Sequence, residues 1–181
     1  MFNFSGKKKQ SKIVVTDKIW ISKENKWQAC INQVMKEKDT IIAVWFDETF
    51  SELETFFSSQ GIATDKILSV RELAPNYIQN NQLIFAGHYP LLSKEQELYE
   101  KLGLSHVTVY SSLDEPLFAH FGGDKIIALV KQMGIKEDEA LENPLITSAI
   151  NKAQDKIKSQ VSFDQSAHSQ ADWFRKNLQT Q

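Results

Sequence analysis

A continuous apolar run over residues 40–46 constrains the fold more than any other feature of the sequence. Such a run is typical of a strand that is covered on both faces, and strands of this kind belong to parallel sheets. Residues 24–37, before the run, and the segment that ends at Gly61, after it, have the apolar spacing of amphipathic helices. Further strand patterns lie at 12–21, 66–70, 82–86 and 106–110. This alternation predicts right-handed βαβ units and a three-layer α/β fold with a parallel sheet.

The α/β part is predicted to end at a strand-to-helix corner in residues 107–126. The strand pattern stops at a Ser-Ser pair, and Ser112 stands three residues before Glu115, as in a capping box that opens a helix. Pro116 suits the first turn of that helix, and the two glycines after Phe121 end it. Beyond the corner the sequence has only helical patterns, so we predict an α-helical C-terminal extension.

Polar residues mark the predicted starts of three other helices. Ser22 precedes the first helix, and either Asp47 or Thr49 is placed to cap the second. Ser93 and Gln96 have the spacing of a second capping box. These caps predict where the helices of the α/β part begin.

The helices beyond the corner differ in how well their apolar faces are covered. A long helix opens at Pro144 and carries Ile150 and Ile157 on an apolar stripe. The last stretch is polar apart from a few residues such as Trp173 and Phe174, and it is either a tail or a helix that needs a surface to lie against. We divide the chain into a flexible basic tail at 1–11, an α/β domain at 12–122, a helical extension at 123–164 and a polar tail at 165–181.

The composition indicates an ordinary globular protein and excludes several classes of function. The 181 residues are 41% hydrophobic and 24% charged, and their net charge of −2 gives no general attraction to nucleic acid or anionic membranes. Arg71 and Arg175 are the only arginines, which argues against a site that holds phosphates with several guanidinium groups. The single cysteine, Cys30, excludes an internal disulfide. Without an apolar run of about 18 residues or a signal-peptide core, we expect no membrane span and a cytoplasmic protein.

Candidate ligand-binding residues lie where the predicted strands end. His88 follows the strand at 82–86, Asp47 follows the run at 40–46, and Arg71 follows the strand at 66–70. Because the carboxyl ends of parallel strands are where α/β proteins bind ligands, these side chains could share a site. The simpler interpretations are that His88 stabilises its loop and that Asp47 caps a helix.

No pattern in the sequence predicts catalysis or metal binding. No serine or cysteine elbow accompanies His88, and no pair of ligands has helical spacing. Cys30 lies within an amphipathic helix, which favours a buried residue over a nucleophile. We therefore predict no catalytic residue, no cofactor and no metal. The candidate contacts for a protein partner are Ile150 and Ile157 on the long helix and Trp173 and Phe174 near the C-terminus.

Several short motifs in the same order resemble the SecA preprotein translocase ATPase family. Residues 110–117 read Tyr-Ser-Ser-Leu-Asp-Glu-Pro-Leu, which is similar to the end of that family's second RecA-like motor domain. Residues 121–126 read Phe-Gly-Gly-Asp-Lys-Ile, and residues 149–157 read Ala-Ile-Asn-Lys-Ala-Gln-Asp-Lys-Ile, as in the family's entry into its helical scaffold. The resemblance thins upstream and covers about residues 13–164. It implies a RecA-like α/β domain followed by the start of the scaffold.

The departures from the family pattern imply that its ATPase activity is not retained. Residues 71–81 form a short loop, with room for one helical turn, in place of the family's nucleotide-contacting segment. Residues 94–106 contain no arginine, although the family has an arginine-rich motif there. The glycine-rich phosphate loop of the other motor domain is also absent from the sequence. The resemblance therefore implies a degenerate motor domain, because phosphoryl transfer needs these groups.

We predict a non-catalytic accessory or protein-interaction module that resembles part of the SecA translocase. Its partners would be translocase components or a second copy of the chain. Two alternatives remain open at this point. One is a small-ligand site at the strand ends, and the other is a nucleic-acid binder derived from a helicase, against which the charge and the two arginines argue.

Overall fold

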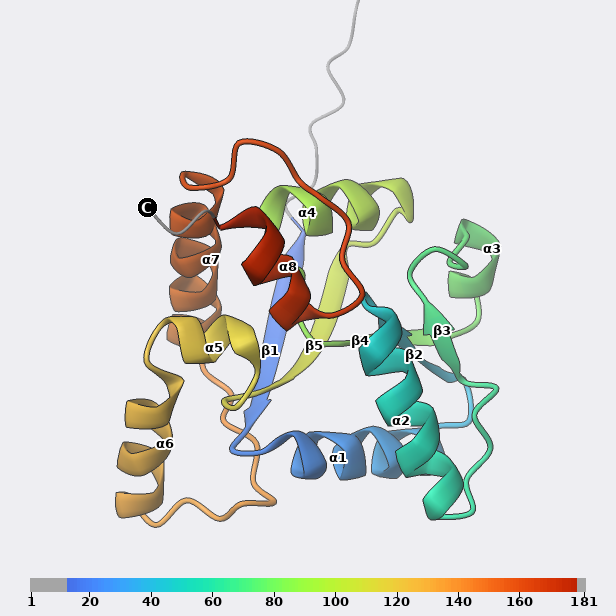
Figure 1. Ribbon diagram of the computed structural model, residues 1–181. Coiled ribbons are helices and arrows are strands. Elements are labelled where there is room, and N and C mark those ends of the chain that lie inside the picture. The colour runs from blue at the N-terminus through green and yellow to red at the C-terminus, as the bar shows by residue number, and fades with distance from the viewer. Residues whose placement is uncertain (1–12, 179–181) are drawn as a thin grey trace, which may run out of the picture.

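The computed structural model describes residues 13–178 and contains a five-stranded sheet in which all strand pairs are parallel. The strand order is β1-β5-β4-β2-β3, so β1 and β3 form the two edges (Figure 1). Helices connect successive strands and cover both faces, which confirms the predicted three-layer α/β fold. The strands are β1 (Val14–Trp20), β2 (Thr40–Val44), β3 (Ile67–Ser69), β4 (Gln82–Ala86) and β5 (His106–Ser112).

One face of the sheet is covered by α1 (Lys23–Lys36) and α2 (Asp47–Ser59). The apolar run is buried at all five positions of β2, as expected for a central strand covered on both sides. Ser22 caps α1 by accepting a hydrogen bond from the backbone N–H of Asn25, as predicted.

The other face is covered by α4 (Leu92–Lys101) together with the segment that contains α3 (Pro75–Ile78). Tyr99 of α4 and Leu102, which follows the helix as its C-cap, pack against Phe85 and Val109 of the sheet. The single turn of α3 lies in the loop where one helical turn was predicted.

Within the described residues, four helices follow the corner after β5 and form a third core cluster with the ends of the strands. Helix α7 lies beside the edge strand β1, and α5 contacts both α6 and α8 (Figure 1). These helices are α5 (Pro116–His120), α6 (Gly123–Gln132), α7 (Pro144–Lys158) and α8 (Gln170–Asn177). No helix in residues 13–178 combines the length and the apolar character that crossing a membrane requires.

Only part of the predicted division of the chain can be compared with the structure. The basic tail at 1–11 lies outside the described residues. Helices α6 and α7 fall within the predicted extension at 123–164. The stretch at 165–181, divided off as a polar tail, contains α8, so the alternative of a helix lying on a surface describes residues 170–177.

The structure corrects two predicted helix starts in the α/β part. Helix α2 begins at Asp47 itself, so this carboxylate sits in the first turn and neither Asp47 nor Thr49 caps the helix. Helix α4 begins at Leu92 with no side-chain cap, which removes the capping box assigned to Ser93 and Gln96. Both helices begin directly after the preceding strand or loop. They are stabilised mainly by the packing of their apolar faces, so a polar cap is not needed.

The corner itself also differs from the prediction. β5 does not stop at the Ser-Ser pair, because Ser111 and Ser112 continue the ladder opposite Ile19 and Trp20 of β1. Helix α5 then begins after Glu115, and neither Ser112 nor Glu115 caps it with its side chain. The hydroxyl of Ser112 instead donates to a carboxylate oxygen of Glu115, at 3.4 Å, inside the turn.

Candidate functional site

Several buried polar side chains gather around the carboxyl ends of β4 and β5. β4 ends at Ala86, and Gly87 then adopts a positive φ of 105°, a conformation that favours glycine. This turn directs the next residue, His88, into the protein, where it is 3% exposed. Two clusters meet there, and both are built from residues of several elements.

The histidine cluster consists of His88, Asp17, Glu95 and Gln154. Nδ1 of His88 lies 2.9 Å from a carboxylate oxygen of Glu95, at the start of α4. Nε2 lies 2.8 Å from a carboxylate oxygen of Asp17, in β1. The other carboxylate oxygen of Glu95 accepts a hydrogen bond of 3.0 Å from the amide of Gln154, on α7. Both ring nitrogens are therefore engaged, so this histidine has no free nitrogen with which to act as a general base.

The charge of the histidine cluster follows from its pKa shifts. Burial alone would lower the pKa of His88, but the carboxylates of Glu95 and Asp17 outweigh it and raise the pKa well above its usual value. Burial would raise the pKa of Asp17, yet the hydrogen bond and charge of His88 outweigh it and lower that pKa. His88 is thus positively charged at neutral pH and shares its charge between two carboxylates.

We expect the stability of the protein to fall as the pH rises above neutrality because of His88. The folded state retains this proton after the unfolded chain has lost it, so the stabilisation is complete below about pH 6.5 and declines until the pH passes the raised pKa. In that window the free energy of unfolding should decrease by about 1.4 kcal/mol per pH unit for this group. Urea denaturation at several pH values measures the slope, and the His88→Gln variant should lack this component. Equal slopes in the two proteins would refute the assignment.

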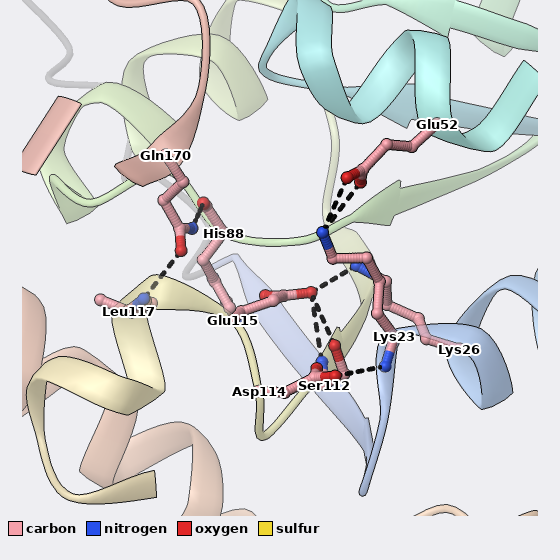
Figure 2. A network of polar contacts seen from close by, with 9 residues as sticks. All are labelled: Lys23, Lys26, Glu52, His88, Ser112, Asp114, Glu115, Leu117 and Gln170. Carbon is pink, nitrogen blue, oxygen red and sulfur yellow. Dashed lines mark hydrogen bonds and ion pairs between the residues drawn. The ribbon is translucent and has the colours of Figure 1, made fainter. Parts of the chain in front are cut away.

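The lysine cluster consists of Lys26, Ser112 and Glu115 (Figure 2). Lys26 points inward from α1, is 2% exposed, and forms an ion pair with Glu115. Its Nζ also lies 3.9 Å from the centroid of the Trp27 ring, within the range of a cation–π contact. The same carboxylate oxygen of Glu115 accepts the backbone N–H of Ser112 at 3.2 Å. A buried lysine and a buried glutamate thus hold α1 to the corner after β5.

Gln170 connects the C-terminal helix to His88 and to the start of α5, as Figure 2 shows. Its side-chain amide donates a hydrogen bond of 2.9 Å to the backbone carbonyl of His88. Its carbonyl oxygen accepts the backbone N–H of Leu117, at the start of α5, at 2.8 Å. Gln170, the first residue of α8, therefore covers the carboxyl ends of the strands.

The space left at the strand ends is small. The cavity bordered by Lys26, Gly87, His88, Glu115 and Gln170 has a volume of about 60 Å³. Small-molecule sites commonly occupy about 300–1,000 Å³. In this conformation the strand ends are therefore filled by side chains of the chain itself.

The three strand-end candidates do not form one site. Arg71 and Asp47 are both exposed and form a long ion pair of 3.5 Å at the surface. Asp47 also lies 3.7 Å from His168, which approaches from the C-terminal segment. His88 is buried in its own cluster and contacts neither of them. All three residues follow strands at the same edge of the sheet. The side chain of His88 points into the protein, however, whereas those of Asp47 and Arg71 lie at the surface.

The four candidate partner contacts lie in or against the third core cluster. Ile150, Ile157 and Trp173 are buried, and Phe174 is partly buried with its ring 5.2 Å from that of His120. The indole N–H of Trp173 donates a hydrogen bond of 2.8 Å to Asp164. The apolar stripe of α7 is therefore buried in this chain's own core, together with Trp173 of α8.

Neither cysteine nor metal chemistry is supported by the described residues. Cys30 is fully buried, and burial raises the pKa of its thiol to about 12, so the thiolate is absent at neutral pH. Within residues 13–178, no three histidine, cysteine or carboxylate groups converge in a way that could hold a metal ion.

Sequence reasoning missed most of the two clusters. Asp17, Lys26, Glu95 and Gln154 were not singled out, and Glu115 was interpreted only as part of a helix cap, although each is buried. One signal was available, because Asp17 lies between apolar residues of a strand and Lys26 precedes Trp27 on the inner face of a helix. A charged residue at such a position needs a buried partner.

The fold and the two clusters define a class of protein: an all-parallel α/β domain whose strand ends are closed by its own polar network. Comparison with known proteins is more specific. The chain is 46% identical over 55 residues to the protein translocase subunit SecA of Acidithiobacillus ferrooxidans, a match that covers 30% of this chain. It is 40% identical over 69 residues, 38% of this chain, to SecA of Acinetobacter baumannii. It is 41% identical over 49 residues, 27% of this chain, to SecA 1 of Alkaliphilus metalliredigens.

This chain therefore contains a SecA-like region. Each match spans only 6% of the length of the SecA protein concerned. No family model matches the chain. The all-parallel sheet with helices on both faces is consistent with a RecA-like domain of that family.

Proposed function

We propose that this chain is a protein-interaction module of the protein translocase machinery, which acts by surface contact and does not hydrolyse ATP. The observation that carries the proposal is an exposed apolar stripe on α6. Ile126, Leu129 and Met133 are 41%, 56% and 67% exposed. Their spacing of three and four residues places them on one side of the helix. Exposed apolar patches of this kind mark sites of protein contact.

The stripe on α6 replaces the surface first expected on α7 as the site of contact. Ile127 and Val130, on the adjoining side of α6, pack into the third core cluster and fix the helix on the domain. The stripe therefore belongs to a helix that is already held by packing and does not need a partner to become ordered. A rigid apolar surface binds at a lower entropic cost than a mobile one.

The closed strand ends support the absence of ATP hydrolysis. A cavity of about 60 Å³ is too small for a nucleotide. Arg71 and Arg175 are engaged with Asp47 and Asp172, so neither is a free guanidinium group directed at the strand ends. Phosphoryl transfer depends on positioned cations around the phosphates. An ATP hydrolysis rate that follows the protein through rigorous purification would contradict this part of the proposal.

We expect lysine substitutions on the stripe to weaken capture of the translocase. In an affinity capture of the tagged chain from its own host, after nuclease treatment, the SecA subunit is quantified by mass spectrometry. The Leu129→Lys/Met133→Lys double variant should reduce its recovery at least about tenfold, because burying one such apolar side chain contributes about 1.5–3 kcal/mol. Because both substituted side chains are exposed, the double variant should have nearly the same melting temperature as the unsubstituted chain.

The matched control is Met35→Lys, which makes the same change at a methionine that is exposed on α1. It should leave the recovery of SecA unchanged. Failure of the unsubstituted chain to recover SecA above background would reject the translocase partner. Loss of recovery in the Met35 control as well would show that added charge, and not the α6 stripe, is responsible.

A further inference from the structure

A groove runs along the edge of the sheet between β1 and α7. β1 is an edge strand, because β5 is the only strand that pairs with it in the part of the chain described here. The groove has a volume of about 660 Å³, which is within the usual range for ligand sites. One wall is formed by residues 13–17, and the other by polar residues of α7 that include Thr147, Ser148 and Asn151.

The direction of the backbone groups of β1 can be followed along the strand. Successive residues of a strand direct their N–H and C=O groups to opposite edges. The N–H of Val14 donates to the carbonyl of Ser105 at 2.9 Å, and the carbonyl of Trp20 accepts the N–H of Leu113 at 2.9 Å. Even-numbered residues of β1 therefore face β5.

The odd-numbered residues of β1 face the groove. Ile19 is one of them, and it forms an antiparallel bridge with Leu141 through two hydrogen bonds of 3.0 and 2.8 Å. The bridge ends there, because the chain turns into α7 three residues later. The outward backbone groups of Val15 and Asp17 have no hydrogen-bonding partner among residues 13–178. An unpaired strand edge of this kind is a template for another strand.

The carboxylate of Asp17 gives the groove a preference for positive charge. One of its oxygens, Oδ2, is buried and makes no hydrogen bond of standard geometry among the described residues, and the only further group that approaches the carboxylate from α7 is the side chain of Thr147, whose weak hydrogen bond helps to lower the pKa of Asp17. His88 carries a single positive charge against the two carboxylates of Asp17 and Glu95. The cluster behind the groove therefore has a net charge of −1, which a cationic hydrogen-bond donor would compensate.

We propose that this groove binds an extended peptide, which adds a strand to the edge of β1 and brings a lysine or arginine side chain to Oδ2 of Asp17. In strand addition, main-chain hydrogen bonds provide the affinity and side-chain contacts provide the specificity. The span from residue 13 to residue 17 matches a peptide of about five residues at about 3.4 Å per residue. This inference rests on the proposed interaction role and specifies a peptide as a partner, at a surface separate from α6.

The test uses a capped five-residue peptide with a central lysine between two valines. Its binding to the full chain is followed by NMR, with amide hydrogen exchange as the second measurement. The peptide should slow exchange of the Val15 and Asp17 amides about tenfold or more. A control peptide with norleucine in place of the lysine should bind about tenfold more weakly. A control peptide with methylated backbone nitrogens should not bind.

The sharpest variant is Val15→Pro. Proline is tolerated on an edge strand where the lost N–H does not serve the sheet, and the outward N–H of Val15 is such a group. Val15→Pro should weaken binding about tenfold or more, whereas Val15→Ala, which keeps the N–H, should bind within a few-fold of the original chain. Circular dichroism melting confirms that both variants fold.

Three results would overturn the inference: no saturable binding of the lysine peptide, equal binding by Val15→Pro, or self-association that occupies the β1 edge and is abolished by Val15→Pro. The last is measured by sedimentation without peptide. Because the α6 variants test the translocase contact independently, loss of the peptide site with intact SecA capture would reject only the peptide inference. Loss of SecA capture with intact peptide binding would reject only the translocase role.

Discussion

The Glu115→Ala variant should lower the free energy of unfolding by about 3–5 kcal/mol. Glu115 is the buried partner of Lys26, and its removal leaves a lysine charge with no counter-ion in the protein interior. The backbone N–H of Ser112 would lose its acceptor as well. Chemical denaturation of the two proteins at neutral pH measures the difference. A loss below about 1 kcal/mol would indicate that Lys26 finds water or another partner.

The chain offers a matched control for this ion pair. Lys23 on α1 contacts Glu52 on α2 at 2.9 Å, but both side chains are more than a third exposed. Glu52→Ala should therefore cost no more than about 1 kcal/mol. The double variant Lys26→Met/Glu115→Leu should recover much of the stability lost in Glu115→Ala, because an apolar pair of similar volume carries no desolvation penalty.

The Trp173→Ala variant should be the most damaging change in the C-terminal region, with an expected loss of about 3–5 kcal/mol. Trp173 is 0% exposed, its ring contacts those of Tyr89 and Phe174, and it belongs to the same core cluster as Ile150 and Ile157 of α7. Its removal opens a cavity beneath α8 and leaves Asp164 without one of its two donors. Thermal and chemical denaturation measure the loss, and proteolysis within residues 162–178 reports whether α8 detaches.

Two variants separate the causes of that loss. Trp173→Phe keeps an aromatic ring but removes the indole N–H, so it should cost less than the alanine variant and isolate the hydrogen bond to Asp164. Phe163→Ala removes an aromatic residue of the same segment that is 75% exposed, and should change stability by no more than about 0.5 kcal/mol. If the alanine variants at 163 and 173 behaved alike, α8 would not be part of the folded core.

The polar clusters show why the candidate site was only partly predictable. His88 was identified from its place after a strand, which is a local feature of the sequence. Its partner Asp17 is 71 residues away in the sequence, and Lys26 is 89 residues from Glu115. No local pattern connects residues at such separations, and their pairing depends on the parallel order of the strands.

The helix starts show the same limit on a smaller scale. Ser22 was identified correctly as a cap because its hydrogen bond is made three residues along the chain. The capping patterns of Ser93 and Ser112 have the same spacing but do not cap helices in the structure. In the second case Glu115 is engaged by Lys26, a residue from a distant helix. Long-range pairing therefore overrides a weak local preference.

The sequence by itself determined the succession of strands and helices and the three-layer parallel sheet. It could do so because burial on both faces of a strand and on one face of a helix leaves a periodic record in neighbouring residues. Only the tertiary structure decided that the strand ends are closed, that Trp173 is in the core, that an apolar stripe of α6 is exposed and that a groove remains beside β1. Those outcomes depend on which distant segments come together. The sequence pattern of an apolar stripe does not show whether the stripe is covered by another part of the same chain or by a partner protein.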